Sequence, residues 1–110
     1  MEPARSVPSI DTMRAAAAEA TSTLFALANE TRLLLLCQLC KGEKSVGELE
    51  ALLDIHQPTL SQQLGVLRSD GLVETRREGK RVYYTVKNPK VITLLTTLFE
   101  LYCPGEVENT

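Results

Sequence analysis

Three cysteines carry the most reactive side chains in this chain of 110 residues: Cys37, Cys40 and Cys103. A thiolate attacks electrophilic sulfur and binds soft metals, whereas an uncharged thiol packs as a small apolar group. A permanent disulfide framework is not expected, because the N-terminus has no apolar leader that would direct the chain to an oxidising compartment. Three roles therefore stay open for these residues: core packing, metal binding or redox chemistry.

A second group of polar residues is suited to binding rather than to reaction. The segment QPTLSQQLGVLR has Pro58 at the first helical position and Leu60, Leu64 and Leu67 at the spacing of a buried stripe. Its remaining side chains are mostly uncharged hydrogen-bonding groups. Glutamine pairs with adenine through two hydrogen bonds, and Ser or Thr contacts bases or phosphates. The candidate DNA-contacting residues are Gln57, Thr59, Ser61, Gln62 and Gln63.

Basic residues gather in one segment, although the formal net charge of the chain is −2. Between Arg76 and Lys87, five basic residues face only Glu78, which leaves a local charge of 5 − 1 = +4. Salt confines such charges to about 10 Å, so a local cluster matters more than the total. The candidate phosphate-contacting residues are Arg76, Arg77, Lys80 and Arg81.

Capping signals predict the helices that position these groups. Asp11 or Thr12 is expected to cap a first helix, Asn29 a second one over 30–40, and Ser45 a short third one in a capping box with Glu48. A turn of three or four residues then leads to the helix at Pro58. Two helices joined in this way form a helix-turn-helix.

After Gly71 the apolar pattern changes to a period of two. Residues 72–86 predict a β-hairpin that turns at Glu78-Gly79 and carries the basic cluster at its tip. Asn88-Pro89 then begins a last helix that is apolar nearly all round. Such a helix is either fully buried or part of a subunit interface, and a chain this short favours the interface.

Length and composition predict a single domain over 1–110, with a flexible arm at 1–10 and a tail at 104–110. No apolar run is long enough for a membrane span, so we expect a cytoplasmic protein without membrane contact. A single histidine, no glycine-rich phosphate loop and no identifiable acid pair argue against an enzyme, and no cofactor is expected.

The order of these elements indicates DNA binding more strongly than any one of them. A polar helix face or a basic turn is usually just exposed to solvent. A capped short helix, a tight turn, a polar-faced helix and a basic hairpin in succession predict a winged helix-turn-helix, mainly α-helical with a small β-hairpin, that binds double-stranded operator DNA.

The stretch from Leu27 to Val86 resembles the ArsR/SmtB family of bacterial winged-helix repressors. LANETRLLLLCQL is similar to the second helix of that family, and SVGELEALLDIHQPTLSQQLGVLRSDGLVETRREGKRVYYTV is similar to its helix-turn-helix and wing. The resemblance implies five helices with a hairpin between the fourth and the fifth, and a homodimer formed through the first and last helices. It also implies repression of an operator that an inducer relieves.

The metal-sensing members of the family need clustered ligands that this chain does not present at the same places. VGELEAL (46–52) has no cysteine where the family's third-helix site needs two or three, and the last helix offers neither Asp nor His. His56 is the only histidine, and a lone histidine there faces solvent or DNA more often than it binds a metal. No metal site is predicted, although three thiols leave a metal or metalloid inducer as an alternative.

LLLCQL, a distal LYC and QPTLSQQLGVLR resemble the sulfide-responsive BigR/SqrR-type branch of the family. That resemblance implies a redox pair, Cys37 and Cys103, which reacts with reactive sulfur species and forms a disulfide or polysulfide bridge. Cys40 departs from the pattern and either packs or offers Cys37 a strained alternative partner. A protein–protein adaptor that never contacts DNA is the remaining alternative.

Overall fold

Five helices and three short strands make up residues 7–103, the part of the chain that the computed structural model describes. The helices are α1 (Ile10–Leu27), α2 (Glu30–Lys41), α3 (Val46–Leu53), α4 (Gln57–Ser69) and α5 (Pro89–Tyr102), and the strands are β1 (Lys44–Ser45), β2 (Glu74–Glu78) and β3 (Arg81–Thr85). The predicted mainly α-helical winged helix-turn-helix is confirmed. The strand β1 was not predicted.

Helix caps agree with the sequence for α2 and α3 but not for α1. The side chain of Asn29 accepts the backbone N–H of Arg32 at 3.0 Å. Ser45 and Glu48 form the expected reciprocal capping box, with distances of 2.9 and 3.2 Å. The prediction of Asp11 or Thr12 as the first cap is wrong. Ser9 has the extended backbone that a cap needs, and its hydroxyl accepts the N–H of Thr12.

Helix α1 begins at the last residue of the arm predicted at 1–10. Ile10 is already helical, residues 7–9 precede the helix, and residues 1–6 lie outside the described part. The acidic Asp11 then lies in the first turn, where a negative charge interacts favourably with the helix dipole. The predicted tail at 104–110 lies outside the described residues as well.

Helix α4 begins at Gln57, one residue earlier than predicted, so Pro58 takes the second helical position. Three residues, 54–56, separate α3 from α4, as the helix-turn-helix requires. Asp54 has φ = 53°, a left-handed conformation that turns the chain between the two helices. The inner face of α4 carries Leu60, Leu64 and Leu67, each of which is fully buried.

The three strands form one antiparallel sheet in the order β1-β3-β2. The predicted hairpin is present, with Glu78 paired to Arg81 around a turn in which Gly79 adopts φ = 62°. Residues Leu72 and Val73, expected in the first strand, precede β2 and lie in the core instead. On the other edge of β3, Ser45 of β1 pairs with Tyr83.

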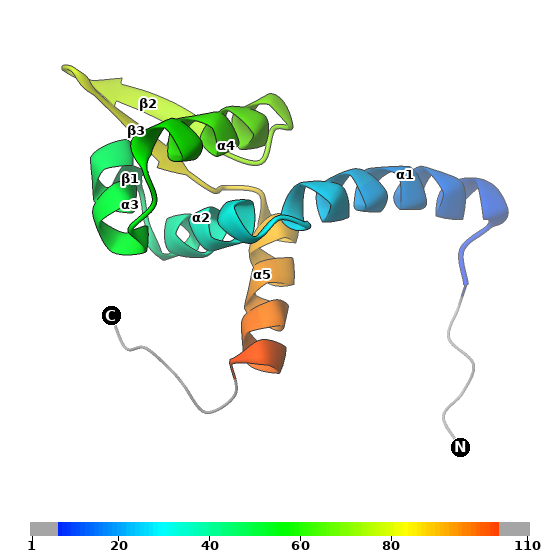
Figure 1. The fold of residues 1–110 in the computed structure, drawn as a ribbon. Coiled ribbons are helices and arrows are strands. Elements are labelled where there is room, and N and C mark those ends of the chain that lie inside the picture. The colour runs from blue at the N-terminus through cyan, green and yellow to red at the C-terminus, as the bar shows by residue number, and fades with distance from the viewer. Residues whose placement is uncertain (1–6, 104–110) are drawn as a thin grey trace.

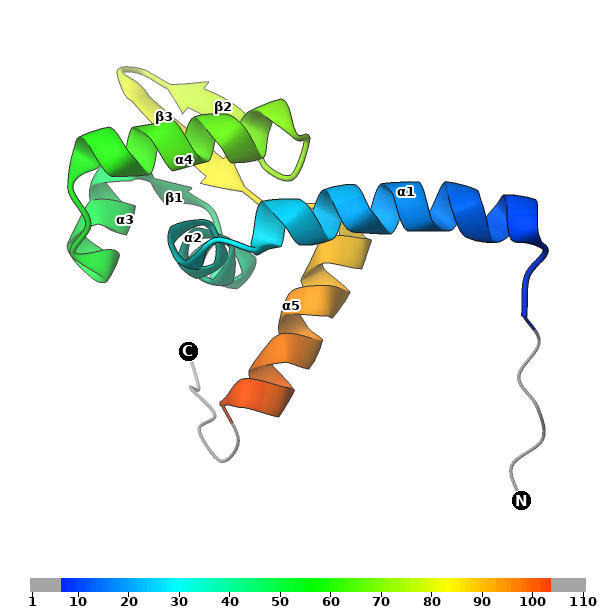
Figure 2. The same ribbon diagram turned by 45° about the vertical axis from the view of Figure 1, so that its right-hand side comes forward.

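The molecule has extents of 54 × 34 × 22 Å, and helix α1 extends away from the rest of it (Figures 1 and 2). Only Ala26 and Leu27, at its C-terminal end, are buried in the core. Within residues 7–103 no single helix is long and apolar enough to cross a membrane. One pair, α1 with α2, meets the length and composition criteria together across a bend of 98°.

Candidate nucleic-acid interface and thiol group

Four of the five polar residues predicted on α4 are exposed, and one is not. Gln57, Thr59, Ser61 and Gln62 face solvent. Gln63 is half-buried, and its amide oxygen accepts a hydrogen bond from Arg32 Nη1 at 3.0 Å. Gln63 therefore has a protein partner that the other four lack among the described residues.

The structure brings the start of α4 and the basic hairpin together. Gln57 of α4 lines the same shallow hollow of about 320 Å³ as Lys80 and Arg81 of the hairpin. The N-terminal residues of α3 complete its wall. A polar side chain of α4 that can contact bases and two cations that can contact phosphates thus share one surface, as duplex binding requires.

The basic cluster on the hairpin is smaller than the sequence suggested, because Arg76 is neutralised from a distant segment. Its Nη2 and Nε contact the Glu43 carboxylate at 2.7 and 2.9 Å, and its Nη1 contacts Glu78 at 2.6 Å. Its guanidinium also lies 4.9 Å from the centre of the Tyr83 ring. The hydrogen bonds from Arg76 hold the pKa of Glu43 below its usual value. The local charge of +4 predicted from the sequence was therefore too high, because it did not count Glu43.

The charged groups of the other candidate cations on the hairpin are available to bind phosphates. Arg77, Lys80 and Arg81 are exposed, and none forms an ion pair with another residue of 7–103. A side chain without an acidic partner contributes its full charge to a phosphate contact. Arg76 is better suited to holding the hairpin in place than to neutralising DNA.

The three thiols occupy different environments around α2 and the end of α5. Cys37 and Cys40 are half-buried on α2, Cys103 is exposed just after α5, and no disulfide joins them. Burial, followed by the nearby charges of Cys40 and Cys103, raises the pKa of Cys37 to about 11. Burial also raises the pKa of Cys40. Among residues 7–103 no group of three or more Cys, His, Asp or Glu side chains is arranged to hold a metal ion.

These environments predict an order of alkylation by iodoacetamide. Cys103 should react first because it is exposed, and Cys37 should react slowly because, with a pKa of about 11, roughly one molecule in a thousand is a thiolate at pH 8. Its rate should rise about tenfold per pH unit until the pH approaches that pKa. Residue-resolved peptide mass spectrometry measures both rates. A Cys37 rate that levelled off below pH 9 would contradict the raised pKa.

Apolar side chains are exposed on α1 and α5, the two helices predicted to form a dimer. On α1 they include Leu24 and Phe25, exposed by 56% and 74%, and on α5 Leu101 and Tyr102, exposed by 66% and 77%. Exposed apolar surface of this extent on neighbouring helices is typical of a protein interface. The side of α5 that faces the core is held by Val91 and Leu95, both fully buried.

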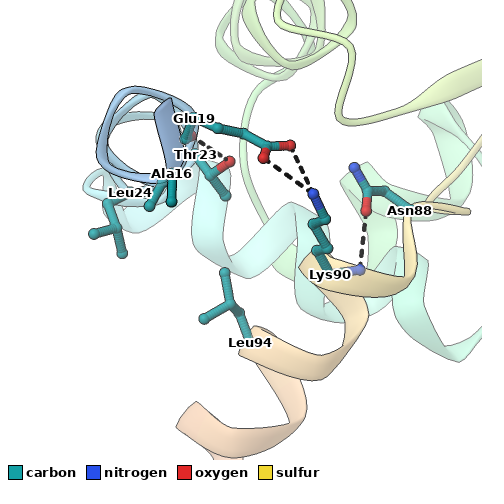
Figure 3. Close-up of a pocket in the computed structure, with 8 residues that line it drawn as sticks. Ala16, Glu19, Thr23, Leu24, Asn88, Lys90 and Leu94 are labelled. Carbon is teal, nitrogen blue, oxygen red and sulfur yellow. Dashed lines mark hydrogen bonds and ion pairs between the residues drawn. The ribbon is translucent and has the colours of Figure 1, made fainter. Parts of the chain in front are cut away.

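An open pocket of about 190 Å³ lies between α1 and α5 (Figure 3). Lys90 of α5 spans it and contacts both carboxylate oxygens of Glu19 of α1, at 3.0 and 2.9 Å. The ion pair bridges the two helices at this point, and both of its side chains are largely exposed. The lining residues are Ala16, Glu19, Ala20, Thr23, Leu24, Asn88, Lys90 and Leu94.

Residues 29–75, from the cap of α2 to the start of β2, match the bacterial regulatory protein arsR family. The chain is also 51% identical over 94 residues to the biofilm growth-associated repressor of Agrobacterium fabrum, a match that covers 86% of this chain and 80% of the relative. The chain belongs to the arsR family. It is a DNA-binding transcriptional regulator of that family, in which α3, the turn at 54–56 and α4 form the helix-turn-helix and the β2–β3 hairpin forms the wing.

Solved structures of other family members have the same fold. The transcriptional repressor BigR from Xylella fastidiosa superposes with a TM-score of 0.81 at 45% identity, covering 87% of this chain and 98% of that one. Reduced HlyU from Vibrio cholerae also gives a TM-score of 0.81 at 45% identity, covering 86% and 99% of the two chains. The predicted membership of this family is confirmed.

Two residues that organise this surface were missed by sequence reasoning. Arg32 holds Gln63, and Glu43 holds Arg76, across separations of 31 and 33 residues. No local motif signals either pair. An arginine just before the leucine run of α2 and an acidic residue just after that helix were the available signals.

Proposed function

We propose that this protein is a homodimeric transcriptional repressor that binds operator DNA and releases it when Cys37 and Cys103 react with a persulfide or polysulfide. Each chain acts as a single domain in the cytoplasm, without enzymatic activity. The observation that supports DNA binding best is the shared surface of Gln57, Lys80 and Arg81, where α4 meets the wing. The exposed apolar faces of α1 and α5 support the homodimer.

The thiol response rests on the placement of Cys37 and Cys103. Cys103 is exposed, so a dissolved sulfur donor can reach it, whereas Cys37 is half-buried. The charge of Cys103 contributes to the raised pKa of Cys37, so the two thiols lie within electrostatic range of each other. Cys37 belongs to α2 and Cys103 follows α5, so a bond between them would link α2, which packs against α4, to the proposed dimer interface.

The reaction proceeds in two balanced steps. The Cys103 thiolate attacks the terminal sulfur of an organic persulfide, forms a protein persulfide and expels the organic thiolate. The Cys37 thiolate then attacks Cys103 Sγ, forms the disulfide and expels hydrosulfide. Two protein thiols are oxidised and one sulfane sulfur is reduced to sulfide, while the proton of Cys37 passes to solvent. Further sulfane sulfur would give a polysulfide bridge instead.

Intact mass spectrometry after persulfide treatment of the reduced protein tests this chemistry. A disulfide lowers the mass of each chain by about 2 Da, whereas each additional bridging sulfur adds about 32 Da. An unchanged mass under conditions that oxidise a control dithiol would contradict the thiol part of the proposal and would leave DNA binding unaffected.

The salt dependence of DNA affinity tests the role of the wing. Replacing Arg77, Lys80 and Arg81 together by Gln should weaken binding to every duplex. It should also reduce the slope of log affinity against log salt by roughly 0.9 for each phosphate that the wing no longer neutralises. Fluorescence anisotropy at several salt concentrations measures both quantities.

Arg76→Gln is the matched control, because Arg76 already pairs with Glu43 and Glu78. It should change the salt slope far less than the triple variant does. Equal slopes in the triple variant and the wild type would show that the wing does not contact phosphates. Wild-type binding that did not depend on salt would contradict the DNA-binding assignment itself.

A further inference from the structure

Arg32 makes three hydrogen bonds that join α1 to α4. Its Nε donates to the carbonyl oxygen of Ala26 at 2.7 Å, and its Nη2 donates to that of Phe25 at 3.2 Å. Both carbonyls belong to the last turn of α1, where a positive charge is favourable, and that of Phe25 also accepts the backbone N–H of Ala28 at 3.2 Å. Its Nη1 donates to Gln63 Oε1 at 3.0 Å.

The backbone of Arg32 is also fixed, so this side chain starts from a rigid point. Its N–H is bound by the cap residue Asn29 at 3.0 Å, in the first turn of α2. The guanidinium therefore lies where the end of α1, the start of α2 and the side of α4 meet. Three of its five N–H groups have partners on elements other than its own.

This contact determines which way the amide of Gln63 points. A guanidinium has only donors, so the Gln63 atom that faces it must be the oxygen, and the amide nitrogen points elsewhere. Recognition of adenine through two hydrogen bonds needs both the oxygen and the nitrogen of the amide on the same base edge. With its oxygen held by Arg32, Gln63 is not free to present that pair, and it is half-buried while Gln62 is exposed.

We propose that Arg32 is a positioning residue for DNA recognition, and that Gln63 acts as its acceptor on α4 rather than as a base-contacting residue. The pair fixes the angle between α1, which carries part of the proposed dimer surface, and α4, which carries the polar face. The inference rests on the proposed binding of DNA by α4. It removes Gln63 from the base-contacting set and leaves Gln57, Thr59, Ser61 and Gln62 there.

Two substitutions of Gln63 distinguish its role as the acceptor for Arg32 from a role in contacting bases, and both leave Arg32 unchanged. Gln63→Glu keeps an acceptor for Arg32 but loses the amide donors, and Gln63→Met keeps the length but loses the acceptor. On a duplex selected from random DNA by the wild-type dimer, Gln63→Glu should bind nearly as tightly as the wild type. Gln63→Met should bind more weakly, on the order of tenfold, a typical magnitude for coupling between sites. The base preference and the salt slope should stay unchanged in both.

A double-mutant comparison of DNA affinities tests whether Arg32 and Gln63 act through the same contact, which the single variants alone do not show. Arg32→Met with Gln63→Met should bind no more weakly than Arg32→Met alone, because the substitution of Arg32 already removes its contact with Gln63. Arg32→Met with Gln62→Met should show the sum of the two single effects, since Gln62 has no contact with Arg32. Dimer content and the thermal unfolding midpoint are measured for each variant, and affinities are compared well below that midpoint.

The outcomes distinguish this inference from the function on which it rests. If Gln63→Glu bound as weakly as Gln63→Met and its preference changed at one base pair, Gln63 would contact that base and the inference would be wrong. Additive effects of Arg32→Met and Gln63→Met would also overturn it. A wild-type dimer that selected no duplex would overturn the proposed DNA binding, and the inference with it.

Discussion

Treatment of the reduced dimer with an organic persulfide is expected to lower its affinity for operator DNA by about tenfold or more. A bridge between Cys37 and Cys103 would hold the C-terminal end of α5 against α2, and so move the apolar face of α5 relative to the helix-turn-helix. Because the two recognition helices of a dimer must enter the major groove about 34 Å apart, a small change in their relative orientation weakens binding. Fluorescence anisotropy with a labelled duplex, before and after treatment, measures the change.

Two serine variants serve as controls for this result. Cys103→Ser should stay bound to DNA after treatment, because the exposed thiol that starts the reaction is absent. Cys40→Ser should respond as the wild type does, because Cys40 is not part of the proposed pair. If Cys103→Ser released DNA as readily as the wild type, the dithiol mechanism would be wrong. If Cys40→Ser stayed bound instead, Cys40 would replace Cys103 as the partner of Cys37.

Leu64→Ala is expected to lower the free energy of unfolding by about 2–5 kcal/mol, the range observed when a buried leucine is truncated. Leu64 has no exposed surface and belongs to the inner face of α4, so the substitution leaves a cavity beneath the helix that carries the polar residues. This loss is a large fraction of the stability of a domain of this size. Urea unfolding followed by circular dichroism measures it.

Val66→Ala is the matched control, because it also shortens an aliphatic side chain on α4 but acts at a position that is 37% exposed. Its expected cost is roughly 0.5 kcal/mol. Similar losses in the two variants would contradict the assignment of Leu64 to the core. The comparison also separates the packing of α4 from its polar face, which neither substitution touches.

Local signals in the sequence predict most of the helices correctly. The capping box of Ser45 with Glu48 and the cap at Asn29 each need only residues three positions apart, so they can be recognised without any tertiary information. The leucine stripe of α4 likewise follows from one helical period. The first cap was misplaced because Ser9, Asp11 and Thr12 are all good capping residues, and only the backbone shows which of them precedes the helix.

Tertiary contacts account for what the sequence could not predict. The strand β1 is two residues long, too short to show any period, and it is a strand only because β3 lies beside it. The partner of Arg76 is 33 residues away, so counting charges along the wing overestimated its local charge. Gln63 has the same residue type as Gln62, and its separate role is visible only from the position of Arg32.

Ser45 belongs to two structures at once, since it pairs with Tyr83 in the sheet and caps α3 through its hydroxyl. The wing is therefore tied to the helix-turn-helix, because moving one relative to the other would pull Ser45 out of the strand or out of the cap. In the proposed mode of DNA binding, the wing and α4 would then act as one head. An inducer would act by turning each head as a whole rather than by reshaping the contacting side chains one by one. The geometry of the proposed dimer would then be the variable that sets affinity.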